Sequence, residues 1–252
     1  MTNAIVAAPH RRHMLSLIVA AVALPVLPHE TWAQAAGSGD AVKLGFIGSG
    51  REGGALGTLF AKKGHPVMFS SRHPETLKEL VASAGPAAKA GTVEEAVAFG
   101  DAIVLVVPYT AVEQIGKEYG KQIAAKRLLL DVSNPIPRRD GEDLVKQVNE
   151  MGGAGLATAK FIPGAKIVRG FNAIGSGKLE PDAAKTDGKV GVPIAGDDRG
   201  AIDLAEALIR EIGFEPVLVG GLAMGKHLVP GTPLGGEHSP EELRQIAATL
   251  KA

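Results

Sequence analysis

The chain has 252 residues, in which 27 lysine and arginine residues balance 27 aspartate and glutamate residues, and it contains no cysteine. The absence of cysteine excludes disulfides, thiol catalysis and cysteine-ligated metal clusters. The balanced charge gives no electrostatic support for binding to nucleic acid or to an anionic membrane surface.

The first residues have the composition of an export signal. A basic start at residues 10–13 precedes an apolar run over residues 14–26, which is too short to span a bilayer. We therefore expect residues 1–35 to be a cleaved signal peptide and the mature protein, with no membrane span, to be periplasmic or otherwise exported. The pair Arg11 and Arg12 resembles a twin-arginine signal, which carries folded proteins. An ordinary secretory signal with a chance arginine pair is the alternative.

The segment over residues 42–70 has the pattern of a dinucleotide-binding unit. An apolar strand over residues 42–47 leads into a glycine-rich turn, an amphipathic helix follows, and a second apolar strand begins at Val67. The turn has the spacing GxGxxG, in which Gly48 permits the tight turn, Gly50 lets the backbone approach a pyrophosphate, and Gly53 lets helix and strand pack closely.

The end of the second strand predicts which dinucleotide binds. An acidic residue at this place would hold the ribose hydroxyls of NAD, whereas this chain has Ser70, Ser71 and Arg72. Two hydroxyl groups and a guanidinium suit a 2'-phosphate, so the preferred cofactor is NADP(H). The alternative is that these residues merely turn the chain before a helix that begins near Glu75.

The remaining elements alternate between strands and helices, which favours an α/β fold with a Rossmann-like, doubly wound parallel sheet. We expect an NADP-binding Rossmann domain over residues 41–134 and a smaller C-terminal α/β region over residues 135–252. The elements expected after the second strand are helices at 75–84, from Thr92 and at 110–123, strands at 102–107 and 128–131, then strands near 167–168, 192–194 and 217–219, a helix at 198–212 and a last helix from Ser239.

Ligands in such a sheet lie beyond the carboxyl ends of the strands. The residues there are Val107, Pro108 and Tyr109, the run over 131–135, the pair Phe171 and Asn172, and residues 220–222. Asp131 could be catalytic, but a carboxylate at a strand end more often caps the following loop.

Asn134 and the histidines are further candidates for a catalytic role. Asn134 precedes Pro135 and is held extended, which favours a positioning role. The histidines at 65, 73, 227 and 238 are expected at the surface or at caps, and their spacing is not that of a metal site.

Together these motifs resemble the NADPH:coenzyme F420 oxidoreductases and the related cytosolic domain of the STEAP metalloreductases. The resemblance runs from about Val42 to Pro230 and rests on the glycine motif, Ser71 and Arg72, Val107 and Pro108, and the stretches 131–135, 169–172 and 221–228. In that family the serine and arginine hold the 2'-phosphate, often with a basic residue at the place of Thr76; here Lys78 is the nearest substitute.

The resemblance also implies a place for each ring. The nicotinamide would lie beside Pro108 and residues 133–135, with a flavin or deazaflavin stacked over it, and Phe171, Asn172 and Leu222 would shape that second pocket. The cofactor-binding residues are then expected to be Gly48, Ser49, Gly50, Arg51, Glu52, Gly53, Ser70, Ser71, Arg72, Val107, Pro108, Ser133, Asn134 and Pro135.

The expected function is an exported NADP-dependent oxidoreductase that passes hydride between NADP(H) and a small-molecule acceptor such as a flavin or coenzyme F420. Direct hydride transfer needs two rings held in contact and demands no catalytic side chain. An imine or hydroxyacid reductase of the pyrroline-5-carboxylate reductase type is one alternative, although those enzymes continue into a largely helical domain. A non-catalytic NADP-binding protein is the other alternative. Because members of the resembling family commonly form homodimers, a homodimer is also possible for this protein.

Overall fold

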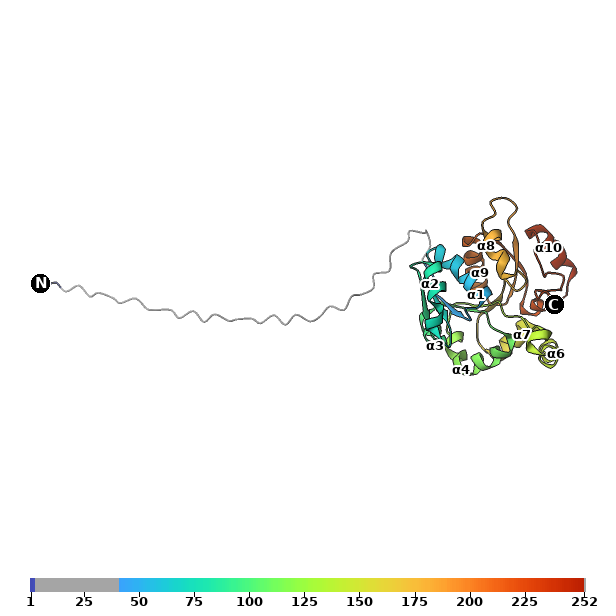
Figure 1. Ribbon diagram of the computed structural model, residues 1–252, viewed down its shortest axis with the longest axis horizontal. Coiled ribbons are helices and arrows are strands. Elements are labelled where there is room, and N and C mark those ends of the chain that lie inside the picture. The colour runs from blue at the N-terminus through green and yellow to red at the C-terminus, as the bar shows by residue number, and fades with distance from the viewer. Residues whose placement is uncertain (3–40, 252) are drawn as a thin grey trace. The chain divides into compact units, whose positions relative to one another are not determined.

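The computed structural model describes residues 1–2 and 41–251 (Figure 1). The expected signal peptide lies, apart from residues 1–2, outside the described residues. The described residues from 41 to 251 belong to one compact unit. None of the helices in the described part has the length and apolar character needed to cross a membrane.

The strands of this unit form one eight-stranded sheet in the order β3-β2-β1-β4-β5-β6-β7-β8. The strands are β1 (Leu44–Ile47), β2 (Val67–Ser70), β3 (Ala88–Gly91), β4 (Ala102–Leu105), β5 (Leu129–Asp131), β6 (Ile167–Arg169), β7 (Gly191–Gly196) and β8 (Glu215–Gly220). Strands β1 to β6 pair in parallel, in the order expected of a Rossmann-like fold.

Helices connect these strands and cover both faces of the sheet. The helices are α1 (Arg51–Lys62), η1 (Pro74–Leu77), α2 (Lys78–Ala84), α3 (Val93–Phe99), η2 (Tyr109–Ala111), α4 (Val112–Ala124), α5 (Pro137–Asp140), α6 (Glu142–Glu150), α7 (Ala154–Phe161), α8 (Ser176–Ala183), α9 (Arg199–Glu211), η3 (Leu222–His227) and α10 (Pro240–Thr249).

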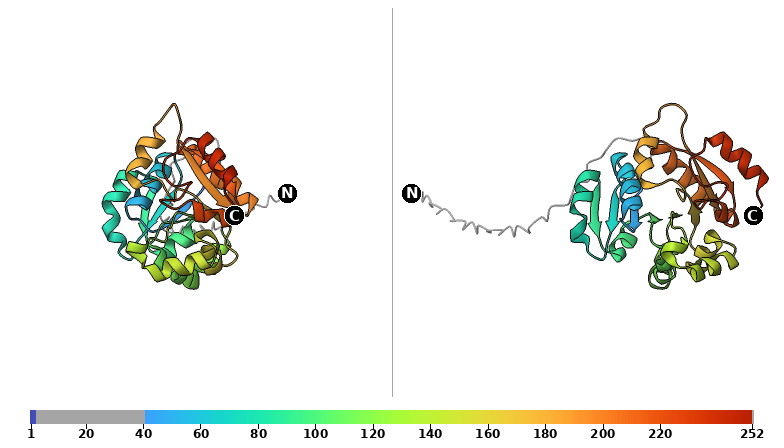
Figure 2. Two further views of the ribbon diagram at one scale, coloured as in Figure 1. Left: turned by 90° about the vertical axis from the view of Figure 1, so that its right-hand side faces the viewer. Right: turned by 45° about the vertical axis from the view of Figure 1, so that its right-hand side comes forward.

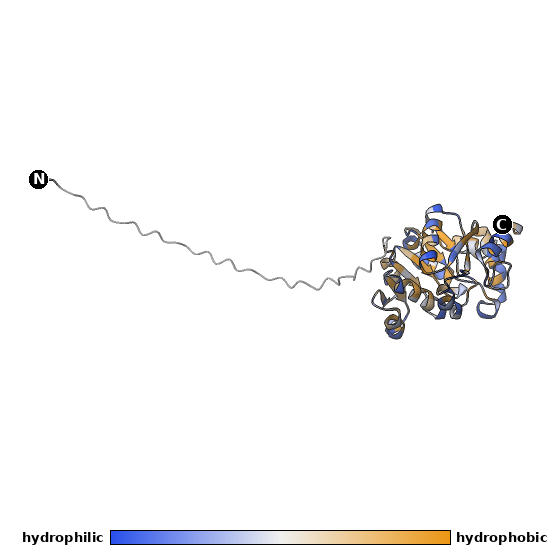
Figure 3. Ribbon diagram, turned by 90° about the horizontal axis from the view of Figure 1, so that it is seen from above, coloured by the Kyte–Doolittle hydropathy of each residue, from blue (hydrophilic) through white to orange (hydrophobic). Residues whose placement is uncertain are grey.

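Alternate side chains of each strand enter different cores because successive residues point to opposite faces. On β1, Leu44 and Phe46 pack with α1, α8 and α9, whereas Ile47 packs with α3, α4 and α7. Figure 2 shows these helices in two layers around the sheet, and Figure 3 shows the hydrophobic residues concentrated on the strands between them. A third cluster, which includes Val217 and Leu243, packs α10 against β8.

The last two strands run against the others. Strand β7 pairs with β6 in the antiparallel sense, through Val168 and Gly196, and β8 is parallel to β7. The sheet is therefore mostly parallel. Only the last residues of β7 pair with β6, so Ala195 and Gly220, near the carboxyl ends of β7 and β8, lie level with Arg169 at the carboxyl end of β6.

The C-terminal region does not build a sheet of its own. Strands β6 to β8 extend the sheet of the N-terminal half, and β5 and β6 are paired through Asp131 and Arg169. Helices α5 to α7 fill the stretch after Asn134, for which no helix was expected. The expected helices that begin after Thr92 and Ser239 are present, each with a complete capping box.

Candidate functional site

The glycine turn between β1 and α1 has the geometry that its spacing predicts. Gly48 has φ +101°, and a Cβ there would clash with the carbonyl oxygen of Val106. A Cβ on Gly53 would clash with the carbonyl oxygen of Gly48, so this glycine lets the helix lie against the turn. A Cβ on Gly50 would meet nothing within 4 Å. Gly50 thus leaves open space at the start of α1, where a pyrophosphate binds in folds of this kind.

Two helices begin at this opening without a side-chain cap. The N-cap residues of α1 and α8 are Gly50 and Gly175, and neither supplies a capping hydrogen bond. In α3 and α10, by contrast, Thr92 and Ser239 cap the first turn. The free backbone N–H groups and the positive ends of the α1 and α8 dipoles make this opening favourable for an anion.

A cavity of about 360 Å³ lies between these two helix starts and the loops after β4, β5 and β6. Its lining residues are Gly50, Arg51, Glu52, Gly53, Val106, Val107, Pro108, Val132, Ser133, Asn134, Ile136, Arg139, Phe171, Asn172, Ala173, Ile174, Gly175 and Pro230. A second cavity of about 770 Å³ shares Gly50 and Arg51 with the first and is lined further along α1 and α2 by residues that include Ser49 and Thr76. The two cavities together run past the glycine turn, as an extended dinucleotide requires.

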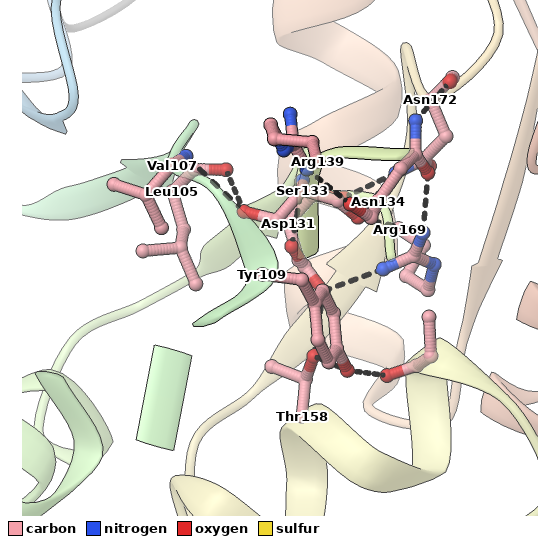
Figure 4. Close-up of polar contacts among 11 residues, drawn as sticks. Leu105, Val107, Tyr109, Asp131, Ser133, Asn134, Arg139, Thr158, Arg169 and Asn172 are labelled. Carbon is pink, nitrogen blue, oxygen red and sulfur yellow. Dashed lines mark hydrogen bonds and ion pairs between the residues drawn. The ribbon is translucent and has the colours of Figure 1, made fainter. Parts of the chain in front are cut away.

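A buried ion pair ties the ends of β5 and β6 together beneath the first cavity (Figure 4). Arg169 and Asp131 are both fully buried, and Nη1 of Arg169 donates to Oδ2 of Asp131 at 2.6 Å. Thr158 on α7 donates to the same oxygen at 2.9 Å, while Oδ1 of Asp131 accepts from the backbone N–H of Ser133 at 2.9 Å. Asp131 is thus a loop cap, as expected, and also an ion-pair partner.

The same arginine fixes the loop that follows β5. Nη2 of Arg169 donates to the carbonyl oxygen of Ser133 at 2.9 Å and to Oδ1 of Asn134 at 3.1 Å. The amide of Asn134 donates to the carbonyl oxygen of Asn172, and the amide of Asn172 donates to those of Asp131 and Ser133. The loops after β5 and β6 are therefore cross-linked by hydrogen bonds in both directions, as Figure 4 shows.

The loop after β4 joins this network through two side chains. The hydroxyl of Ser133 accepts from the N–H of Val107 at 3.3 Å and donates to the carbonyl oxygen of Leu105 at 3.2 Å. The hydroxyl of Tyr109 donates to the carbonyl oxygen of Ala154 at 2.8 Å. Burial raises the pKa of Tyr109, so this hydroxyl is neutral and serves the structure.

Two buried polar atoms on the first cavity have no hydrogen-bond partner among the described residues. One is Oε1 of Glu52 in the first turn of α1, and the other is Oδ1 of Asn172, a residue that is 5% exposed. Burial raises the pKa of Glu52 to about 7, although a hydrogen bond from the backbone of Ser176 opposes the rise. Such atoms are uncommon in folded proteins and indicate a ligand or water that completes them.

The corner after β2 differs in part from expectation. Ser70 is 3% exposed, and its hydroxyl accepts from the N–H of Gly48, so it supports the glycine turn and does not face solvent. The hydroxyl of Ser71 accepts from the N–H of His73, and the side chain of Arg72 is exposed. Ser71 and Arg72 thus remain as groups that can reach a 2'-phosphate, while Ser70 does not.

Three other expected site residues lie differently from the prediction. Leu222 is buried beside Gly155 and Arg169, where its N–H donates to Asp197, and it does not line the first cavity. Phe171 does line the cavity, but its ring packs edge-on against Phe214 in the core, at 5.4 Å between centroids. Pro135 is half-buried and is not among the lining residues.

The histidines have structural partners. His65 was expected at the surface, but it is 5% exposed, because Nδ1 accepts from the N–H of Val42 and Nε2 contacts Glu211. His73 is exposed and pairs with Glu75 at 3.3 Å, while His227 and His238 contact backbone carbonyl oxygens.

Some residues at the cavity carried no signal that the sequence could show. Arg139 on α5 and residues 173–175 before α8 line the cavity, but they lie beyond the residues that directly follow the predicted strands. Gly175 before Ser176 was the available hint, since a helix that begins at a glycine leaves its first turn open.

Comparison with known proteins finds a family that matches the N-terminal part of this site. Residues 43–135, which contain β1 to β5, match the family "NADP oxidoreductase coenzyme F420-dependent". The match covers 93 of the 252 residues and supports, over this segment, the resemblance to that family expected from the sequence.

Relatives extend the likeness beyond the matched segment. The metalloreductase STEAP3 of Rattus norvegicus is 28% identical over 192 residues, which cover 75% of this chain and 36% of the rat protein. The crystal structure of a hypothetical protein from Sinorhizobium meliloti is 27% identical, with a TM-score of 0.65 over 79% of this chain and 95% of the other. This chain therefore spans about a third of the metalloreductase but nearly all of the bacterial protein.

A protein from Arthrobacter sp. FB24, described as an F420-dependent NADP reductase, shares the fold at 18% identity, with a TM-score of 0.63 over 73% of this chain and 87% of the other. An imine reductase from Myxococcus stipitatus in complex with NADP+ shares it at 19% identity, with a TM-score of 0.53 over 72% of this chain and 56% of the other.

Proposed function

We propose that this protein is an exported enzyme that transfers hydride between NADP(H) and a flavin or deazaflavin acceptor. The observation that carries the proposal is the opening at Gly50, where two uncapped helix starts face one cavity. The diphosphate lies at these helix starts, and the 2'-phosphate lies between Ser71 and Arg72.

In this reaction the protein holds the nicotinamide and the acceptor ring in position and excludes water from them. When bound, NADPH supplies the hydride. Val107 and Pro108 support one side of the nicotinamide site, and the loop over residues 133–134 supports the other. Because the ion pair of Arg169 and Asp131 fixes that loop from below, the ring is held with little freedom.

A flat, polar ring suits the rest of the first cavity. The unpartnered Oδ1 of Asn172 is an acceptor, and its amide group is held in place by two backbone carbonyl oxygens. The N–H groups of a flavin or deazaflavin would satisfy that oxygen. The family model and the Arthrobacter protein, both of which name coenzyme F420, support this choice of acceptor.

The test is binding followed by turnover with purified protein. Calorimetry should show NADPH binding more tightly than NADH. Oxidation of NADPH, followed by its absorbance, should then depend on added flavin or deazaflavin. Binding without oxidation by any of these acceptors would leave a non-catalytic NADP-binding protein, and oxidation with a cyclic imine but not with flavins would favour an imine reductase.

The export part of the proposal is tested separately. The pair Arg11 and Arg12 in the N-terminal segment supports export of a folded, nucleotide-loaded protein. Replacing both arginines by lysine should leave uncleaved precursor in the cytoplasm, as shown by fractionation and immunoblotting. Undiminished export of this variant would contradict the twin-arginine route, and a wild-type protein found in the cytoplasm would contradict export itself.

A further inference from the structure

The carboxyl group of Glu52 lies at the helix starts where the negatively charged diphosphate of the proposed nucleotide would bind. Glu52 is the second residue of α1, two positions after Gly50, and it lines the first cavity. Its Oε1 is buried without a hydrogen-bond partner among the described residues. The backbone N–H of Ser176, the first residue of α8, also interacts with this carboxyl group, so it lies between the two uncapped helix starts.

Two effects compete for the proton of Glu52. A position at a helix start favours the carboxylate, because the dipole and the free N–H groups attract negative charge. Burial favours the neutral acid, because it removes the charge from water. Burial is the larger effect here and raises the pKa of Glu52 to about 7, although the backbone of Ser176 lowers it. The carboxyl group therefore exchanges its proton near neutral pH before any ligand is considered.

No charged side chain accounts for this property, because the shift arises from burial and one backbone group. The charged groups on α1 and on the elements around it are Arg51 and Lys62 on α1, Lys78 and Glu79 on α2, Arg138, Arg139 and Asp140 on α5, and Lys178, Glu180 and Asp182 on α8. Several of these are paired elsewhere. Lys62 contacts Glu180, Lys178 contacts Glu237, and Arg139 contacts Asp140.

We propose that Glu52 binds the nucleotide as a neutral carboxylic acid, donates a hydrogen bond to a phosphate oxygen, and so makes NADP(H) binding take up a proton. The inference rests on the proposed function and adds to it. A carboxylate would compete with the diphosphate for the same helix starts and would repel it, whereas the acid supplies a donor. The unpartnered oxygen of Asn172 lies on the same cavity and is a second buried group that a ligand or water would complete.

The sign of the pH dependence follows from the linkage of binding and protonation. Affinity for NADPH should be greatest below the pKa of the free carboxyl group, where Glu52 already carries its proton. It should fall as the pH rises through about 7, because binding must then extract a proton from solvent. The dissociation constant is expected to rise by up to about tenfold per pH unit in that range.

Calorimetry on the wild-type protein tests this without any variant. NADPH binding is measured at pH 8 in HEPES and in Tris, which differ in ionisation enthalpy. The difference in observed heat should correspond to uptake of roughly half a proton or more per nucleotide. Equal heats in the two buffers would overturn the inference and leave the proposed function standing. A wild-type protein that binds no NADPH at any pH would overturn the proposed function, and this inference with it.

A matched pair of variants assigns the proton to its residue. Glu52→Gln keeps the shape and a donor but cannot titrate, so its affinity should be nearly independent of pH and its proton uptake should be lost. Glu94→Gln is the control, because Glu94 is also the second residue of a helix but is exposed on α3. Glu94→Gln should behave as the wild type does. Proton uptake that persists in Glu52→Gln would contradict the assignment to Glu52.

Discussion

At the scale of single residues, the proposed cofactor preference depends on one exposed guanidinium. Arg72 is exposed at the corner after β2, and Ser70, which the sequence placed beside it, is buried under the glycine turn. Discrimination between NADPH and NADH therefore falls mainly to Arg72 and Ser71. A basic residue at Thr76, common in the resembling family, is absent, although Thr76 does line the second cavity.

Arg72→Ala should weaken NADPH binding by roughly 2 kcal/mol, about thirtyfold, because a charge-assisted contact to the 2'-phosphate is lost. NADH has no such phosphate, so its affinity should barely change. Arg127→Ala is the control, since Arg127 is exposed just before β5 at the opposite edge of the sheet. Calorimetry with both nucleotides measures the effect, and equal losses for NADPH and NADH would contradict the role of Arg72.

Glu52 should also affect the stability of the protein without ligand. Its pKa is raised by burial to about 7, so the folded state holds a proton more firmly than the unfolded chain does. The stabilisation is fully present below the unfolded pKa and is lost as the pH rises through about 7. Glu52→Gln should therefore raise the free energy of unfolding at pH 8 by roughly 1–2 kcal/mol, a figure discounted for partial exposure, and should have little effect at pH 4.

Urea unfolding of both proteins at the two pH values measures this difference. A gain of equal size at pH 4 and pH 8 would show that the substitution acts through packing and not through the charge.

Asp131→Asn should be strongly destabilising, because it leaves Arg169 buried without its counter-ion. Breaking a buried pair by removing one partner typically costs about 3–5 kcal/mol. The matched control is Asp203→Asn, which breaks an exposed pair with Arg199 and should cost about 0.5 kcal/mol or less. Urea unfolding measures both losses. If Asp131→Asn costs no more than the control, the buried network does not stabilise the loops.

This pair also marks what local sequence can and cannot predict about the site. The sequence predicted Asp131 as a loop cap because the signal is local. A carboxylate at the end of a strand commonly accepts a hydrogen bond from the backbone N–H two residues later, as Asp131 does. Its pairing with Arg169 depends on the adjacency of β5 and β6, whose partners are 38 residues apart in sequence. The hydrophobic periodicity of the sequence does not predict a contact between residues so far apart in the chain.

Among the helices, some N-termini carry a side-chain cap and others do not. Helices α3 and α10 carry capping boxes, whereas α1 and α8 begin at glycines and face the cavity. The capped helices were predicted because a capping box is a pattern of four consecutive residues that the sequence shows directly. Helices α5 to α7 were missed because glycine and proline interrupt the sequence there, and the tertiary structure stabilises short helices between them.

Gly50→Thr should separate ligand binding from folding. Threonine is as good an N-cap as glycine, and a Cβ at this position meets nothing within 4 Å, so the thermal midpoint should stay close to that of the wild type. The added side chain would occupy the space proposed for the diphosphate, and NADPH affinity should fall by at least about tenfold.

Gly48→Ala provides the contrast, because its positive φ and the clash with Val106 make it destabilising whether or not a nucleotide binds. Thermal melts and calorimetry on the two variants give the comparison. Unchanged NADPH affinity in Gly50→Thr would place the diphosphate elsewhere.

At the scale of the whole molecule, one sheet joins the two regions that the sequence separated near residue 134. The alternation of strands and helices predicted a doubly wound parallel sheet, but β3 (Ala88–Gly91) was not among the expected strands. It did not predict the reversal at β7, because the direction of a strand depends on how its connection crosses the sheet and not on its composition.

A shared sheet and the buried pair across β5 and β6 imply that both regions unfold together. We expect a single urea transition in which far-UV circular dichroism coincides with the fluorescence of Tyr109 and Tyr119, both of which lie in the N-terminal half. Leu243→Ala, which opens a cavity under α10, should shift both signals equally, because its cost is passed through the sheet to β1 to β5. If the tyrosine signal keeps its midpoint while part of the circular dichroism shifts, β7, β8 and α10 form an independently stable unit, and the boundary near residue 134 is a true domain boundary.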